Sequence, residues 1–172
     1  MGKSADMSRS LVRDAVSADL PKLVEIYNHY VIHTPITFDL APVTLEQRAV
    51  WMQQYATLGR HRLLVCEDAG SVVAYASSHQ FRIKPAYDTT VELSCYCAPD
   101  AVGRGLGTRL YSALFDAISG EDIRSFIAGI TLPNPASIAL HRRFGFVAVG
   151  TMHAVGRKFD QYWDVTWYER LA

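Results

Sequence analysis

The sequence predicts an α/β (α+β) fold in which a mixed sheet is covered by helices on both faces. Short β-rich runs and apolar runs at helical spacing alternate along the chain, and this order is typical of a sheet with helices packed on it. The length of 172 residues suits one domain with its own core. We therefore expect a flexible start at residues 1–10 and a single domain over residues 11–172.

The composition excludes several classes of function. The chain has 17 basic and 17 acidic residues, so it lacks the positive charge that nucleic-acid binding requires. No apolar run reaches the roughly 20 residues of a spanning helix, and the polar start MGKSADMSRS has no hydrophobic signal segment. We expect a cytoplasmic protein that binds neither nucleic acid nor a membrane.

The first part of the chain predicts one short strand and two helices. The strand is SLVRDA, residues 10–15, and Ser17 then offers a side-chain oxygen as helix N-cap. Two prolines within residues 33–42 indicate a loop after this helix. Thr44 and Gln47 form a capping box for a second helix. The second helix is expected to carry Trp51, Tyr55 and Leu58.

The middle of the chain predicts a hairpin and a further strand. RLLVCE and SVVAYASS are β-rich runs joined by the turn sequence DAGS. A polar and aromatic loop, QFRIKPAYD, precedes the strand TTVELSCYC. The elements expected after it are a helix over 105–118, a strand over 123–131, a helix over 135–144, and strands over 146–155 and 161–169.

Three cysteines, Cys66, Cys95 and Cys97, leave an odd number and do not suit a disulfide scaffold. Cys95 and Cys97 lack a second ligand pair at a spacing that suits zinc. We interpret all three as buried apolar thiols and expect no metal site.

Three glycines, Gly103, Gly105 and Gly107, stand at the entry of the helix predicted over 105–118. Backbone N–H groups in such a turn approach an anion closely, and the helix dipole favours negative charge there. Thr108 and Arg109 do not complete a P-loop, and the spacing does not fit the dinucleotide fingerprint. On this pattern alone, a tight strand-to-helix turn and a phosphate-binding loop remain equally open.

The segment LPNPASIALHRRFGF predicts a short helix with clear ends. Asn134 is its N-cap, Pro135 occupies the first helical position, and Gly145 ends it. His141 lies on this helix one turn after Ser137, where a surface or packing role is the ordinary interpretation.

Together these segments resemble the GCN5-related N-acetyltransferase superfamily, and within it the phosphinothricin and methionine-sulfoximine acetyltransferase branch. The segments that carry the resemblance, in order, are IYNHYV, TPITF, AYDTTVELSCYC, GRGLGTRLY, LPNPASIALHRRFGF and GRKFDQYWDVTW. They span nearly everything from residue 11 to residue 169. The resemblance implies a mostly antiparallel sheet of about seven strands, acetyl-CoA as co-substrate and a homodimer.

The resemblance also implies the residues that hold acetyl-CoA. The superfamily pattern Q/R-x-x-G-x-G/A falls on VGRGLG, and its first position here is Val102, which removes one side-chain contact to the pyrophosphate. A strand edge at residues 94–97 would bind the pantetheine arm as a further strand does, and Asn134 would reach that arm from the other side. The implied set is Ser94, Cys95, Tyr96, Cys97, Val102, Gly103, Arg104, Gly105, Leu106, Gly107 and Asn134.

Acetyl transfer to an amine needs a base for the ammonium and an acid for the departing thiolate. Alternation along TTVELSCYC leaves Glu92 on the opposite face from the apolar residues. A solvent-facing or salt-bridged glutamate is the common case, whereas partial burial would raise its pKa toward that of a working base. The resemblance favours Glu92 as the base and His141 as the acid, with Tyr96 or Tyr111 as substitutes for His141.

Aromatic and cationic loops are candidates for the acceptor site, because an amino acid analogue presents a carboxylate. Arg82 suits a bidentate contact to such a group, although each candidate also has an ordinary interpretation as a surface residue. The resemblance places these loops around the substrate, partly across a dimer interface. The candidates are Phe38, Phe81, Arg82, Tyr87 and Lys158.

We therefore expect acetyl transfer from acetyl-CoA to the α-amine of a small amino acid analogue such as phosphinothricin, methionine sulfoximine or methionine sulfone. One alternative keeps the chemistry and changes the acceptor to another amine or a protein N-terminus. A further alternative is a non-catalytic acyl-CoA-binding domain, which the loss of the usual residue at Val102 would suit.

Overall fold

A seven-stranded mixed sheet forms the centre of the computed structural model, which describes residues 10–172. The strand order is β1-β2-β3-β4-β5-β7-β6, and every neighbouring pair is antiparallel except β4 and β5. The predicted mixed, mostly antiparallel sheet is confirmed. The strands are β1 (Leu11–Asp14), β2 (Arg62–Asp68), β3 (Ser71–Gln80), β4 (Thr90–Cys97), β5 (Ser125–Thr131), β6 (Val147–Lys158) and β7 (Gln161–Leu171).

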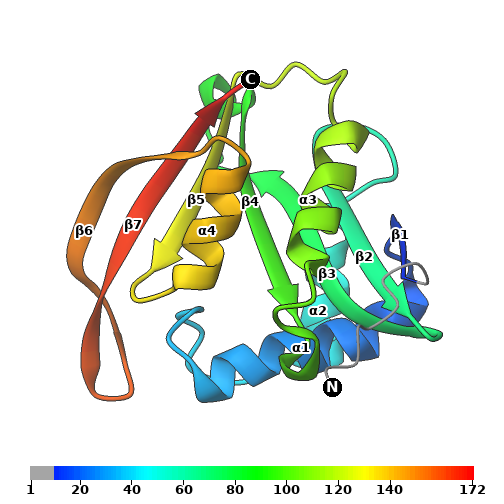
Figure 1. Ribbon diagram of the computed structural model, residues 1–172, viewed down its shortest axis with the longest axis horizontal. Helices are drawn as coiled ribbons and strands as arrows, with labels where there is room; N and C mark the ends of the chain where they lie inside the picture. Colours follow the sequence, from blue (N-terminus) through cyan, green and yellow to red (C-terminus); the bar gives the residue numbers. More distant parts are fainter. Residues whose placement is uncertain (1–9) are drawn as a thin grey trace, which may run out of the picture.

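Helices cover both faces of the sheet, as predicted. The core between the sheet and helices α3 (Leu106–Ala117) and α4 (Pro135–Arg143) includes Leu110. The core on the opposite face joins α1 (Leu20–His33) and α2 (Leu45–Met52) to β2 and β3. Figure 1 shows α3 and α4 in front of the sheet. Alternate residues of one strand feed the two cores, because successive side chains point to opposite faces.

The first helix begins later than the sequence predicted, and Ser17 is not its N-cap. Ser17 lies in a 3-10 turn over Ser17–Asp19, and α1 follows from Leu20. The carboxylate of Asp19 accepts a hydrogen bond from the backbone N–H of Val16 (2.8 Å) and forms an ion pair with Arg13 (2.8 Å). Asp19, rather than Ser17, therefore fixes the entry of the chain into the helix.

The second helix is shorter than predicted. Its capping box is confirmed, since Thr44 accepts from the backbone N–H of Gln47 and Gln47 reaches back to Thr44. The helix ends at Met52, where the next backbone N–H groups bond three residues back and tighten the last turn. Tyr55 and Leu58 therefore lie in the following loop instead of on the helix.

The start of the described chain is held against the body of the protein. Of the predicted flexible start, residues 1–9 lie outside the described residues. Ser10 is buried, and its hydroxyl and carbonyl oxygens accept hydrogen bonds from Arg109 on α3. Over residues 10–172, no helix has the length and apolar character needed to cross a membrane.

All three cysteines are free thiols. Cys66 is buried, whereas Cys95 and Cys97 are half-buried and pack against the same core. The side chains of His, Cys, Asp and Glu in residues 10–172 nowhere gather in a group of three that could hold a metal ion.

The two central strands stay together for only a short distance. Parallel pairing of β4 and β5 covers Thr90, Val91 and Glu92, opposite Ser125, Phe126 and Ile127. Beyond Glu92 the strands diverge, as Figure 1 shows. Residues Ser94–Cys97 continue to pair with β3 on their other side. The divergence leaves one edge of β4 without a strand partner inside the sheet.

The α3 core supplies a test of the fold. Leu110 is fully buried (0% exposed) in the core on the α3 face, so Leu110→Ala removes packed methyl groups and leaves a cavity. We expect the free energy of unfolding to fall by about 2–5 kcal/mol, measured by denaturant titration.

Leu58→Ala is the matched control, because Leu58 is 81% exposed and its truncation should change stability by less than about 0.5 kcal/mol. Equal effects of the two substitutions would contradict the burial of Leu110.

Candidate active site

Two cavities meet where β4 and β5 diverge. The aromatic cavity, about 580 Å³, lies between β3, β4 and helix α2, and its lining includes Tyr27, Arg48, Trp51, Tyr75 and Glu92. The glycine-loop cavity, about 500 Å³, lies between the start of α3 and α4. The cavities share six lining residues: Ile36, Leu93, Ser94, Tyr96, Gly129 and Thr131. The two cavities therefore adjoin at the gap between the strands.

Glu92 lines the aromatic cavity directly before Leu93 and Ser94, which line both cavities. Its side chain is 27% exposed, and its Oε2 lies 3.8 Å from Nε2 of His79, the residue opposite it on β3. Burial raises the pKa of Glu92, and the charge of Arg82 works against this rise. The prediction that Glu92 faces away from the apolar side is confirmed, since Val91 and Leu93 enter the α3 core.

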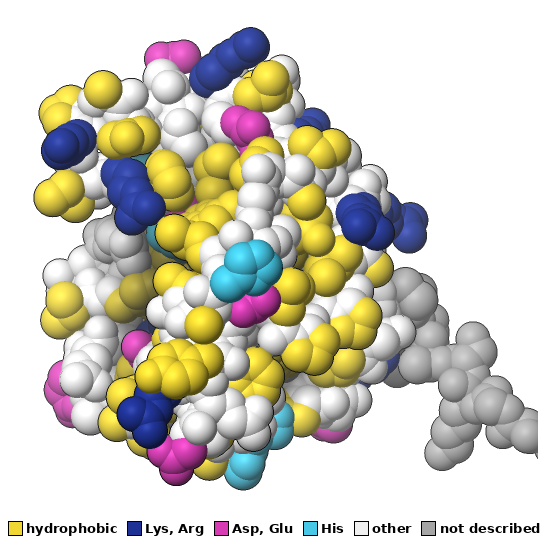
Figure 2. Space-filling model, turned by 90° about the vertical axis from the view of Figure 1, so that its left-hand side faces the viewer, with side chains coloured by type: hydrophobic (Ala, Val, Ile, Leu, Met, Phe, Trp, Pro, Cys, Tyr) yellow, Lys and Arg dark blue, Asp and Glu magenta, His cyan; other side chains and the backbone are white. Residues whose placement is uncertain are grey.

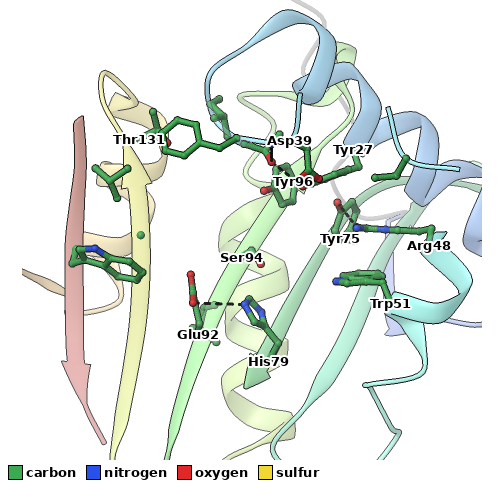
Figure 3. Close-up of a pocket in the computed structure, with 18 of the residues that line it drawn as sticks. Tyr27, Asp39, Arg48, Trp51, Tyr75, His79, Glu92, Ser94, Tyr96 and Thr131 are labelled. Carbon is green, nitrogen blue, oxygen red and sulfur yellow. Dashed lines mark hydrogen bonds and ion pairs between the residues drawn. The ribbon is translucent and has the colours of Figure 1, made fainter. Parts of the chain in front are cut away.

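His79 stays neutral beside Glu92. Burial lowers the pKa of His79 to about 4, and the charge of His61 adds to this effect. The Nδ1 atom of His79 is buried and has no hydrogen-bond partner in the described chain. Figure 3 shows the two side chains facing each other from neighbouring strands. The pair thus supplies one carboxylate of raised pKa next to an uncharged imidazole.

The glycine-rich turn before α3 forms one wall of the glycine-loop cavity. Gly103 and Gly105 adopt left-handed backbone conformations, with φ of 81° and 74°, and Gly105 is the N-cap residue of α3. A Cβ at Gly107 would come within 3.1 Å of Leu140 on α4. The turn therefore needs its glycines for its own shape and for helix packing. It also lines the cavity through Val102, Gly103, Gly105, Leu106 and Gly107.

The other predicted cofactor residues divide between the cavity and its surroundings. Ser94, Cys95, Tyr96 and Cys97 line the glycine-loop cavity, as does Asn134. The side chain of Asn134 also accepts from the backbone N–H of Ser137 (3.1 Å), which confirms it as the N-cap of α4. Arg104 is outside the lining and forms an ion pair with Asp68.

His141 is buried on α4 and lines the same cavity. Its Nδ1 lies 2.8 Å from the carbonyl oxygen of Ser137 and its Nε2 lies 2.9 Å from the hydroxyl of Tyr111. A carbonyl only accepts, so Nδ1 carries the proton and Nε2 accepts from Tyr111. Burial lowers the pKa of His141. The surface role is therefore wrong for this histidine, which is buried.

The five predicted acceptor residues do not gather at one place in the single chain. Phe38 lines the aromatic cavity. Phe81 packs against Tyr87 and Trp167, with ring centroids 5.8 and 6.0 Å away. Arg82 is exposed and lies over the Phe81 ring, and neither it nor Tyr87 lines a described cavity. Lys158 is buried and donates to the carbonyl oxygen of Thr37 (2.7 Å).

Sequence reasoning missed most of the aromatic cavity. Its prominent residues are Tyr27, Arg48, Trp51, Tyr75 and His79. One local signal was available, because Arg48 and Trp51 are three residues apart on a helix and so lie on one face. His79 and Tyr75 carried no such signal. Their positions opposite Glu92 and Tyr96 depend on the register of β3 against β4, which the long loop between these strands leaves undetermined.

Comparison with known proteins identifies the architecture. The family described as Acetyltransferase (GNAT) domain matches residues 12–167. The chain belongs to the GNAT acetyltransferase family. The resemblance inferred from the ordered motifs is thereby confirmed, and so is the fold that it implied.

Relatives of this GNAT acetyltransferase carry specific names. A phosphinothricin N-acetyltransferase of Streptomyces coelicolor is 53% identical over 92% of this chain and 94% of its own length. An L-methionine sulfoximine/L-methionine sulfone acetyltransferase of Pseudomonas paraeruginosa is 38% identical over 92% of both chains. The crystal structure of a phosphinothricin acetyltransferase from Sinorhizobium meliloti in complex with AcCoA matches with a TM-score of 0.89 and 34% identity, covering 94% of this chain and 88% of that one.

The neutral His79 of this GNAT acetyltransferase predicts a pH effect on stability. An unfolded histidine has a pKa near 6.5, whereas burial lowers that of His79 to about 4. Protonation therefore favours the unfolded chain, and the contribution of His79 is complete above about pH 6.5 and falls toward pH 4. Compared with His79→Gln, the wild type should lose on the order of 2 kcal/mol more unfolding free energy between pH 7 and 4.5.

Denaturant titrations at each pH measure this difference. Ring-carbon NMR of His79 gives an independent reading. A midpoint near pH 6.5 would contradict the burial of its imidazole.

Proposed function

We propose that this acetyltransferase moves an acetyl group from acetyl-CoA to the α-amine of a small amino acid analogue of the phosphinothricin, methionine sulfoximine or methionine sulfone type. The observation that carries the proposal is the junction of the two cavities at Leu93 and Ser94, next to Glu92. An acyl donor in the glycine-loop cavity and an amine in the aromatic cavity meet there. The names of the relatives support the choice of donor and acceptor.

Acetyl-CoA is proposed to bind along the glycine-loop cavity. Backbone N–H groups from Val102 to Gly107 face the pyrophosphate, and the start of α3 adds the positive end of its dipole. The free edge of β4 at Ser94–Cys97 accepts the pantetheine arm as an additional strand, with Asn134 on the opposite wall. The side chain of Val102 offers no polar contact, so the pyrophosphate would be bound by backbone N–H groups. Arg104 adds positive charge near this turn but is held by Asp68.

Glu92 is proposed as the general base. It lines the cavity that receives the amine, and its raised pKa makes it a stronger base than an ordinary glutamate. It takes the ammonium proton, directly or through a water molecule. The freed amine then attacks the thioester carbonyl carbon, and the C–S bond breaks with its electron pair on the CoA sulfur.

His141 is proposed to deliver the proton that the CoA thiolate takes up. In the free protein Nδ1–H is bound to the Ser137 carbonyl and Nε2 accepts from Tyr111, so the imidazole has no spare proton to give. We propose that Nε2 takes up the second proton, which the amine nitrogen loses as it attacks, and passes it to the CoA sulfur. Tyr111 is fully buried, keeps its own proton and positions the imidazole. Tyr96 lines both cavities and is the substitute donor if the imidazole is dispensable.

A homodimer is proposed to complete the acceptor site. Strand β6 is an edge strand that exposes Val147, Val149, Met152 and Val155, and apolar patches of this kind mark association surfaces. Figure 2 looks onto the β6 side of the molecule and shows hydrophobic side chains gathered over it. Phe81, Arg82 and Tyr87 are proposed to contact the acceptor across this interface, whereas Lys158 is buried against Thr37 of its own subunit and has no such role. The three free thiols suit a cytoplasmic location.

The proposed reaction is tested by thiol release from acetyl-CoA with a panel of amines. We expect turnover with L-phosphinothricin, L-methionine sulfoximine and L-methionine sulfone, and little with ordinary amino acids or peptides. Glu92→Gln should lower kcat by about 10²- to 10⁴-fold while the affinity for CoA, measured by calorimetry, stays unchanged.

Turnover restricted to peptides or other amines would replace the acceptor while keeping the reaction. Binding of CoA without turnover across the panel would favour the non-catalytic acyl-CoA-binding domain.

The proposed dimer is tested by light scattering after size-exclusion chromatography. We expect about twice the chain mass of 19.2 kDa. Val149→Glu places a charge on the apolar β6 face and should yield the monomer, whereas Leu58→Glu, at an exposed loop position, should leave the mass unchanged. A monomeric wild type would refute the dimer.

A further inference from the structure

Arg48 is the only lysine or arginine among the residues known to line the aromatic cavity. It is 5% exposed. Its Nη2 donates to the hydroxyl of Tyr75 (2.7 Å), and its buried Nε has no hydrogen-bond partner within residues 10–172. No carboxylate in that part of the chain forms an ion pair with it. The guanidinium is therefore a buried cation without a counter-charge.

Both acidic groups that line this cavity are directed elsewhere. Asp39 accepts a hydrogen bond from the hydroxyl of Tyr27 (2.7 Å). Glu92 faces His79. The cavity thus contains one fixed positive charge, and neither carboxylate on its wall neutralises it.

Aromatic rings hold the guanidinium in place. Its central carbon lies 3.3 Å from the ring centroid of Trp51, 4.6 Å from that of Tyr27 and 5.3 Å from that of Tyr75. The faces of these rings attract a cation, yet they offer no lone pair to its in-plane N–H groups. A guanidinium fixed by stacking keeps its planar fork available for an oxyanion, which it matches with two parallel hydrogen bonds.

We infer that Arg48 binds an acidic group of the acceptor, a carboxylate or a phosphinate. The inference rests on the proposed function, because it names the group that selects among amine acceptors. Figure 3 shows Arg48 on the α2 side of the cavity and Glu92 on the β4 side. An acceptor whose amine approaches Glu92 and whose acidic group contacts Arg48 spans the cavity. Amines without an acidic group cannot make the contact to Arg48. Arg48 therefore determines specificity for acidic acceptors over neutral ones.

The test compares acceptors with and without the acidic group. In Arg48→Gln we expect KM for phosphinothricin to rise at least tenfold, with a smaller change in kcat. Arg48→Lys keeps the charge without the planar fork, so its KM for phosphinothricin should lie between those of the wild type and Arg48→Gln. Carboxamide analogues, in which the α-carboxylate is neutral, should bind weakly and alike to wild type and Arg48→Gln if that carboxylate is the partner. Arg142→Gln, which removes a surface charge on α4, is the matched control and should retain wild-type KM.

A binding measurement separates this inference from catalysis. Trp51 is in contact with the guanidinium, so its fluorescence should report acceptor binding in the absence of acetyl-CoA, and Trp51→Phe identifies that signal. The dissociation constant for an acidic acceptor should rise at least tenfold in Arg48→Gln.

The source of the oxyanion follows from the acceptor pairs. If the effect of Arg48→Gln on acceptor binding disappears with the α-carboxamide, the α-carboxylate is the group that contacts Arg48. If the effect of Arg48→Gln persists with phosphinothricin α-carboxamide and is missing with methionine sulfone, the phosphinate is the group that contacts Arg48. Both results support an oxyanion contact at Arg48.

The inference is overturned if Arg48→Gln, folded by circular dichroism, discriminates acidic from neutral acceptors as well as the wild type does. It is equally overturned if Arg82→Gln alone removes that discrimination. Should Arg48→Gln not fold, Arg48→Lys provides the same comparison. Absence of turnover in the wild type would refute the proposed function, whereas the fluorescence titration would still decide whether Arg48 binds acidic acceptors.

Discussion

The short parallel contact between β4 and β5 is the constraint on which the site depends. Three residue pairs join the strands, and Glu92 is in the last of them. Had the pairing continued to Cys97, the edge of β4 would be saturated and the two cavities would be separated by a closed sheet. The strands on either side remain paired, so the opening does not break the sheet into two. The space for binding arises because β4 and β5 form no hydrogen bonds with each other beyond Glu92.

The pleat of β4 assigns its side chains to different tasks at this opening. Val91 and Leu93 enter the core beneath α3 and α4, while Glu92, between them, faces the aromatic cavity. A carboxylate at position 92 is thus carried by a strand that is anchored on its other face. A side chain on such a strand keeps its position better than one on a loop. The apolar alternation of this strand has a structural role and also fixes the direction of Glu92.

Local patterns in the sequence predicted the elements well where one residue type dictates the backbone. The capping box at Thr44 and the N-cap at Asn134 are local hydrogen bonds between near neighbours, so spacing alone reveals them. The prediction that Ser17 is the helix N-cap was wrong because the ion pair with Arg13 fixes the carboxylate of Asp19 at the helix start. The face of Glu92 followed from alternation within one strand. The identity of its neighbour His79 did not, since that depends on the register between two strands and on a loop whose path the sequence leaves open.

The uncharged state of His79 preserves the basicity of Glu92. A protonated imidazole 3.8 Å from the carboxylate would favour the charged form of Glu92 and lower its pKa. Burial prevents this, because it disfavours charge on both groups and so moves their pKa values in opposite directions. The remaining positive influence is that of Arg82, which offsets only part of the rise. The apolar and aromatic wall therefore makes the glutamate a better proton acceptor without placing a competing cation beside the amine.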